Sequence, residues 1–211
     1  MTYTTLNKIY TGQYNRCDNR LTRLLDHFGK KKPDDEPLSL QTVLDVNGLD
    51  CALDYLKYCE GVEQKARLFA VWCVRRVQER VEQHYVNPKS FATLVESLNV
   101  AEQHANGTAS DDELTLAQNQ LKVTSKSGSE AARWAFGAAM NACETSPLVA
   151  ASFASAFAST AMSWVEVPPS GNVYSWNEEQ WHRVLKARQD ALSSETHKQE
   201  IEFKRVFCSN H

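Results

Sequence analysis

The chain has 211 residues, of which 42% are hydrophobic and 23% are charged, with a formal net charge of -3 and a pI of about 6.1. This composition is typical of a globular protein with one domain, or one domain and a small appendage. The slight acidity argues against a general nucleic-acid binder, because such proteins carry an excess of Lys and Arg that releases counterions from phosphates.

The N-terminal sequence MTYTTLNKIYTGQYNRC has no charged segment followed by an apolar run, so no signal peptide is predicted. Residues 148–164 are the best membrane candidate, but they are slightly short for a span and only weakly apolar. None of the 6 cysteines forms a CxxC pair. We therefore expect a cytoplasmic protein with free thiols and no disulfides.

Helical spacing dominates the chain, and no run alternates as a strand would. Its 8 glycines and 6 prolines fall mostly at helix boundaries. In the N-terminal part, short helices are predicted over residues 17–29, 39–48 and 50–61, with Ser39 and Asp50 as N-caps. The charged loop KKKPDDEP, residues 30–37, separates the first two.

Residues 65–85 are predicted to form the central helix of the fold. Its first half, RLFAVWCV at residues 67–74, is apolar nearly all round, so it must be surrounded by other elements. Its second half has one apolar stripe and one charged face. We expect this helix to begin inside the protein and to emerge at the surface.

The rest of the chain also reads as helices with recognisable starts. Asn87 with Pro88 begins one, and Ser110 with Glu113 forms a capping box for the next. Two helices rich in Ala, Ser and Gly follow over residues 130–143 and 146–164, and Ser175 with Glu178 is predicted to cap the last long helix. A short segment over residues 200–207 closes the chain.

These patterns predict an all-α fold, a compact array of seven to nine helices around the Arg67–Tyr85 helix. Residues 1–128 would form one helical part. Residues 129–211, with the Ala-rich helices and the last helix, would pack onto the same core, so that the chain is one domain overall.

Every candidate catalytic motif in the sequence is explained at least as well by an ordinary structural role. Glu179 and His182 form a single E-x-x-H step, whereas di-iron bundles need two such steps and further glutamates. Cys208 and His211 are spaced like half of a zinc site without a second half. Cys73 lies in the apolar half-helix, where a reactive thiolate is disfavoured. We therefore expect no metal, no cofactor and no enzymatic activity.

Two charged features are candidates for binding a partner protein. One is the acidic loop Asp34, Asp35 and Glu36, which has no helix N-terminus to stabilise. The other is the arginine face of the central helix, with Arg75, Arg76 and Arg80. Mixed charge on a helix face is usual, so a solvated surface is the alternative for each.

Part of the sequence resembles a family of bacterial and phage immunity proteins with a helical domain of the polymorphic-toxin immunity type. The resemblance covers about residues 17–120. Four stretches carry the resemblance. The first two are the DDEP loop at residues 34–37 and NGLD with Ala52 and Leu53 at residues 47–53. The other two are RLFAVWC with Arg75, Arg76 and Val77 at residues 67–77, and VAE with Ala105, Asn106 and Gly107 at residues 100–107. The resemblance implies a helical binding protein involved in toxin or phage conflict.

The expected function is thus non-catalytic inhibition of another protein, either a toxin or, if the gene is viral, a host defence component. Three alternatives stay open: a metal-dependent enzyme that uses Glu179 and His182, a nucleic-acid binder that uses the arginine helix, and a homodimer built on the Ala-rich helices.

Overall fold

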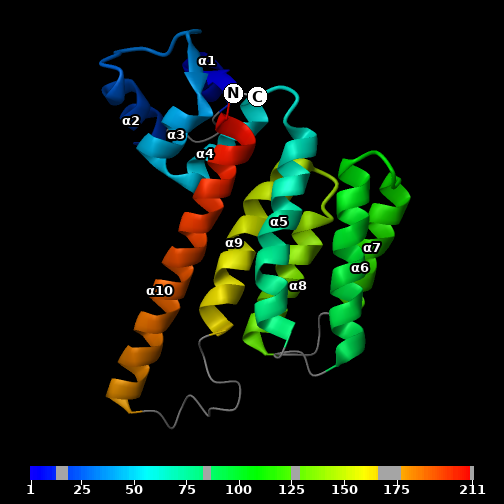
Figure 1. Ribbon diagram of the computed structural model, residues 1–211. Helices are drawn as coiled ribbons and strands as arrows, with labels where there is room; N and C mark the ends of the chain where they lie inside the picture. The colour runs from blue at the N-terminus through cyan, green and yellow to red at the C-terminus, as the bar shows by residue number, and fades with distance from the viewer. Residues whose placement is uncertain (13–18, 83–86, 125–128, 166–176, 210–211) are drawn as a thin grey trace.

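The computed structural model describes residues 1–12, 19–82, 87–124, 129–165 and 177–209 (Figure 1). In this part of the chain the helices are α1 (Leu6–Gly12), α2 (Asn19–His27), α3 (Leu40–Asn47), α4 (Leu49–Tyr55), α5 (Glu63–Val81), α6 (Pro88–Ala105), α7 (Asp111–Thr124), α8 (Glu130–Ala142), α9 (Pro147–Val165) and α10 (Glu178–Phe203). A 3-10 turn, η1 (Leu56–Tyr58), follows α4, and a π-helical turn, η4 (Lys204–Cys208), follows α10. The all-α class is confirmed; the described residues form ten α-helices, and α1 was not expected.

A small antiparallel sheet joins the beginning of the chain to the segment before α3. Strands β1 (Tyr3–Thr5) and β2 (Pro37–Ser39) pair with Thr4 opposite Leu38. These two strands were not predicted, because no alternating run marks them in the sequence. Each strand has three residues, which is too short for an alternating pattern to be seen in the sequence.

Three of the predicted helix starts are confirmed by side-chain contacts. The Ser39 hydroxyl accepts a hydrogen bond from Thr42 N at 3.1 Å, and Asn87 Oδ1 accepts one from Lys89 N at 2.9 Å. In the capping box before α7, Glu113 N donates to Ser110 Oγ at 3.2 Å, and Ser110 N donates to Glu113 Oε2 at 2.8 Å. These contacts satisfy backbone N–H groups that have no partner within the helix.

Other predicted boundaries are wrong. Helix α4 begins directly after Gly48, whose φ of 82° separates it from α3, so Asp50 lies in its first turn and is not the cap. Helix α10 has Asn177 as its N-cap and Gln180 as the second residue of the capping box, two residues further along than the predicted pair Ser175 and Glu178. Ser175 itself lies outside the described residues. The expected separate segment at residues 200–207 continues α10 into η4, because no Gly or Pro interrupts the helix.

Helix α5 lies at the centre of the bundle, as predicted, and packs against α6, α8 and α9 (Figure 1). Its first half buries Ala66, Ala70 and Cys73 on one side. Leu68 and Trp72 on the other side are only half-buried and the first turn is exposed, so the expectation that this half is surrounded on all sides and begins inside the protein is wrong. Tyr85, the predicted end of this helix, lies outside the described residues. Buried residues from both sections of the chain, before and after residue 128, belong to one hydrophobic core.

Helix α9 shares the centre with α5 and also packs against α8 and α10. Small residues permit its close contact with α8: a Cβ at Gly137 would collide with the ring of Phe157. By length and composition α9 could span a membrane, but half of its apolar window is buried inside the bundle. Its buried alanines are therefore explained by packing within the chain.

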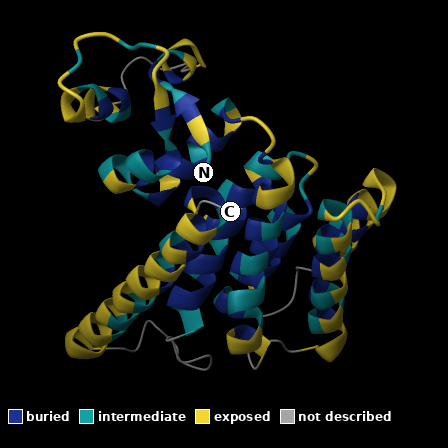
Figure 2. Cartoon of the chain, turned by 45° about the horizontal axis from the view of Figure 1, so that its top comes forward, coloured by how far each residue is buried: buried dark blue, intermediate teal, exposed yellow. Residues whose placement is uncertain are grey.

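The two halves of α10 differ in burial (Figure 2). Its first 17 residues, 178–194, contain no buried side chain, whereas its last turns bury Glu195, Gln199, Glu202 and Phe203. Gln199 Oε1 accepts a hydrogen bond from Ser155 at 2.6 Å and one from Ser159 at 3.2 Å, both on α9. The C-terminal half of α10 is thus the part that holds this helix to the bundle.

Candidate functional site

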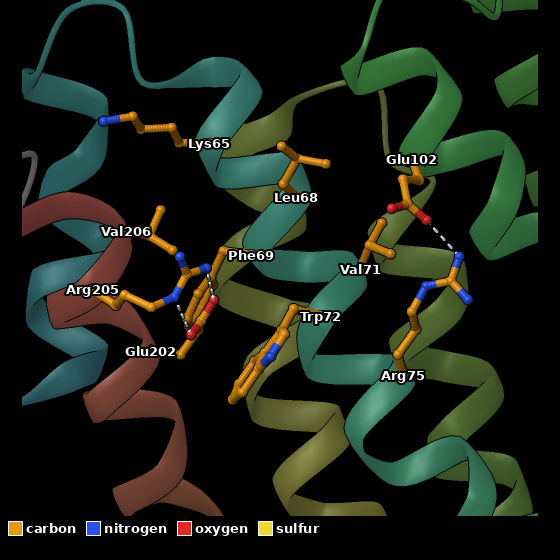
Figure 3. Close-up of a pocket in the computed structure, with 10 residues that line it drawn as sticks. All are labelled: Lys65, Leu68, Phe69, Val71, Trp72, Arg75, Glu102, Glu202, Arg205 and Val206. Atoms are coloured by element: carbon orange, nitrogen blue, oxygen red, sulfur yellow. Dashed lines mark hydrogen bonds and ion pairs between the residues drawn. The ribbon is translucent and has the colours of Figure 1, made fainter. Parts of the chain in front are cut away.

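A groove of about 370 Å³ lies along α5, between α6 on one side and the end of α10 with η4 on the other (Figure 3). Its floor is apolar and is formed by Leu68, Phe69, Val71 and Trp72 of α5 together with Val206 of η4. Leu68 and Trp72 are only half-buried, so part of each side chain is available inside the groove. Its volume falls within the range of ligand-binding pockets, about 300–1,000 Å³.

Helical spacing explains why these residues face the groove. Lys65, Leu68, Trp72 and Arg75 recur every three or four residues and therefore lie on one face of α5. The opposite face carries Ala66, Ala70, Val74 and other core residues. The same helix thus supplies both the centre of the core and the floor of the groove.

An ion pair stands on each wall of the groove. On the α6 side, Arg75 Nη2 lies 2.6 Å from Glu102 Oε2 and also donates to Asn99 Oδ1 at 2.9 Å. On the other side, Arg205 donates through Nη2 and Nε to the two oxygens of Glu202, at 2.6 and 2.8 Å. Hydrogen bonding to Glu202 raises the pKa of Arg205 above its ordinary value. Each guanidinium group therefore has a carboxylate partner that offsets its charge.

Lys65 is the remaining charged residue of the groove, and it stands at the end nearest the start of α5 (Figure 3). Within the described part of the chain its ammonium group makes no hydrogen bond or ion pair. The groove thus combines an apolar floor, two neutralised walls and one unpaired positive charge.

The predicted arginine face is divided between two sides of α5. Arg75 lines the groove, whereas Arg76 turns toward α10, where its Nη2 lies 3.3 Å from Glu195 Oε2 and its guanidinium lies 5.7 Å from the ring of Trp72. Arg80 is exposed in the last turn of α5. Carboxylates on α6 and α10 therefore occupy Arg75 and Arg76, which leaves less positive charge for phosphates than the nucleic-acid alternative requires.

The predicted acidic loop lies away from the groove, between α2 and β2. Lys30 Nζ lies 2.6 Å from carboxylate oxygens of both Asp34 and Glu36. Hydrogen bonding to Lys30 lowers the pKa of Asp34. Asp35 has no such contact among the described residues. The structure therefore does not bring the acidic loop and the arginine face together into one site.

Arg67 has a role that was not predicted. Its side chain is only 1% exposed, and its guanidinium donates to the carbonyl oxygens of Ala142 at 2.8 Å and Thr145 at 3.0 Å. Burial lowers the pKa of Arg67. Arg67 therefore satisfies carbonyls at the C-terminal end of α8 and has a structural function.

The candidate residues for metal or thiol chemistry do not assemble in the described part of the chain. Glu179 pairs with Arg183 at 2.7 Å on the exposed half of α10, and no group of three or more His, Cys, Asp or Glu side chains able to hold a metal is found there. The five described cysteines are free and buried. Burial raises the pKa of Cys73 well above its ordinary value, and it raises that of Cys143 to about 12. Cys17 and His211 lie outside the described residues.

Comparison with known proteins gives no match to a family model, to a curated protein or to a solved structure.

Proposed function

We propose that this protein binds and inhibits another protein without catalysis, and that the groove along α5 is its main contact surface. The partner is a toxin or, if the gene is carried by a phage, a bacterial defence component. The observation that carries the proposal is the half-buried pair Leu68 and Trp72, framed by the ion pairs of Arg75 and Arg205.

This arrangement has the composition of a protein-binding hot spot. Trp and Arg are enriched at positions where substitution by Ala strongly weakens binding, and a rim that excludes water usually surrounds them. Because the floor residues belong to α5, which is packed against α6, α8 and α9, the groove keeps its shape before the partner arrives. Such preorganisation lowers the entropic cost of association.

The acidic loop Asp34, Asp35 and Glu36 would act as a second, peripheral contact. Exposed charges at the rim of an interface mainly accelerate encounter with an oppositely charged partner and add little affinity. A basic partner, such as a nuclease, would be attracted by this loop.

The test is affinity capture with the tagged protein in the organism that carries the gene, followed by mass spectrometry. Leu68→Asp places a charge on the groove floor. Leu116→Asp is the matched control, because Leu116 is 58% exposed on α7 and lies outside the groove. We expect one stoichiometric partner with the unsubstituted protein and with Leu116→Asp, and its loss with Leu68→Asp.

The captured protein is then assayed for its own activity while the inhibitor is titrated in. The proposal expects the activity to fall to a plateau at one equivalent. It would be overturned by a partner that both variants retain, by a captured protein whose activity does not change, or by the absence of any partner.

A further inference from the structure

The groove has the length and direction of a short helix. Lys65 and Arg75, which mark its two ends along α5, are separated by ten residues, and this corresponds to about 15 Å at a rise of 1.5 Å per residue. A partner helix of about three turns lying beside α5 would cover this length. Its apolar side chains at positions i and i+3 or i+4 would meet Leu68 and Trp72, which are themselves four residues apart.

The backbone around the groove favours a helical occupant over an extended one. All the residues that line it belong to α5, α6, α10 or η4, whose backbone groups are bonded within their own helices. The sheet residues of β1 and β2 do not line it. An extended segment would find no strand edge here for its N–H and C=O groups, whereas a helix satisfies these groups internally.

The charges of the groove specify the polarity of the occupant. Glu102 and Glu202 each already have an arginine partner at 2.6 Å, so neither carboxylate needs a basic residue from the partner. Lys65 has no ion pair among the described residues, and it lies one turn from Leu68. An acidic side chain one turn from the apolar positions of the partner helix would complement it.

From these three observations, and on the basis of the proposed function, we infer that the groove receives an amphipathic helix of the partner. Two apolar side chains of this helix pack on Leu68 and Trp72, and an Asp or Glu one turn away pairs with Lys65. The binding surface of the protein is thus specific for an acidic amphipathic helix.

Peptide selection tests the inference without knowledge of the natural partner. Two libraries of 15-residue peptides, one held on a helical scaffold and one in an extended loop, are selected against the full-length protein. Enriched peptides are counter-selected against Leu68→Asp, so that only binders of the groove are retained. Their dissociation constants are then measured for the unsubstituted protein, for Lys65→Glu and for Lys65→Met.

We expect the helical library to yield groove binders with an acidic residue one turn from paired apolar residues. Lys65→Glu should weaken them about tenfold or more, the size expected for loss of one charge-assisted contact. Reversal of the peptide's acidic residue to Lys should restore binding to Lys65→Glu. Because Lys65 is exposed, neither variant should change the unfolding midpoint, and this serves as the control for folding.

Other outcomes overturn the inference. These are groove binders only from the extended library, helical binders with no acidic preference, equal affinity for Lys65→Glu, or no groove binder from either library. If the cellular partner is nevertheless lost with Leu68→Asp, the proposed function stands and only the helical, acidic ligand is rejected.

Discussion

The two halves of α5 use arginine in opposite ways. In the first half, Arg67 is 1% exposed and binds only backbone carbonyls, those of Ala142 and Thr145. In the second half, the side chains of Arg75 and Arg76 are 34% and 35% exposed, and each pairs with a carboxylate of a neighbouring helix. Arg67 binds backbone carbonyls inside the core, whereas Arg75 and Arg76 link α5 to α6 and α10 by ion pairs near the surface.

The comparison shows that a buried arginine does not need a carboxylate as its partner. The C-terminal end of a helix presents unpaired carbonyls and the negative end of the helix dipole, and both stabilise a cation. The five donors of a guanidinium can serve two carbonyls at once. Arg67 thus links the end of α8 to the centre of α5, and this fixes the part of the bundle on which the groove is built.

Arg67→Met should cause the largest loss of stability among substitutions of the α5 arginines. It leaves the buried carbonyl of Ala142 and the part-buried carbonyl of Thr145 without the arginine donor, and we expect a loss of about 3 kcal/mol in the free energy of unfolding. Chemical denaturation at neutral pH measures this loss. Arg67→Lys is the matched control and should recover part of the stability, because Lys keeps the charge without the planar fork. A loss below about 1 kcal/mol for Arg67→Met would show that these contacts contribute little.

The Arg76–Glu195 pair should respond unequally to removal of its two partners. Glu195 is 1% exposed, so Arg76→Met leaves a buried carboxylate whose remaining cationic partner among the described residues is Lys198, at 4.0 Å. We expect a loss of about 2 kcal/mol. Glu195→Gln removes the buried charge and leaves Arg76 free to turn toward water, so its cost should be smaller. Urea unfolding measures the free energy of unfolding of both variants. A larger loss for Glu195→Gln than for Arg76→Met would contradict this explanation.

Cys143, whose thiol lies near the contact of Arg67 with Ala142, should make the free energy of unfolding depend on pH. Burial raises the pKa of Cys143 to about 12 from its ordinary 9.0, so the folded protein retains a proton that the unfolded chain releases above pH 9. The contribution of the protonated Cys143 to the free energy of unfolding is fully present at pH 8, and it is lost as the pH rises from 9 toward 12.

Between pH 8 and pH 10 the unsubstituted protein should therefore lose about 1 kcal/mol more stability than Cys143→Ala. Other groups that titrate in this range are common to both proteins and cancel in the difference. Equal losses for the two proteins would indicate that Cys143 is accessible to water in the folded state.

The smallest stability effect is expected for Arg75→Ala in the second half of α5. Arg75 and Glu102 are partly exposed, and pairs of this kind contribute about 0.5 kcal/mol. The affinity for the partner should fall more than the stability, because the substitution removes a wall of the groove. Thermal unfolding and a binding titration of the same variant compare the two effects. A stability loss larger than the loss of binding free energy would assign Arg75 to the fold and not to the site.

Much of the fold was predictable because local signals agree with the final packing. The all-round apolar half-helix RLFAVWCV predicted the buried centre, and Ser39, Asn87 and Ser110 marked helix starts that the structure confirms. Helix α1 was missed because it buries only Leu6 and Ile9, and the sheet was missed because three-residue strands carry too little periodicity. The start of α10 was predicted two residues too early, because Ser175–Glu178 and Asn177–Gln180 both fit a capping pattern.

The site was less predictable because it joins residues that are far apart in the chain. Arg75 was proposed from its helix face, but Glu202 and Arg205 were not, since nothing local indicates that the end of α10 borders α5. One signal for Arg67 was present in the sequence. An arginine between Ala66 and Leu68 in an apolar half-helix lies where burial is expected, and a buried charge needs partners.

The most direct test of the central claim is site-specific photocross-linking in the native host. A photoreactive phenylalanine analogue replaces Leu68 in the groove, Asp35 in the acidic loop, or Leu116 on α7, one position at a time. We expect a single cross-linked protein from position 68, the same one that affinity capture retains, and none from position 116. Cross-links from position 116 or position 35 with none from position 68 would contradict the claim that the α5 groove is the binding surface.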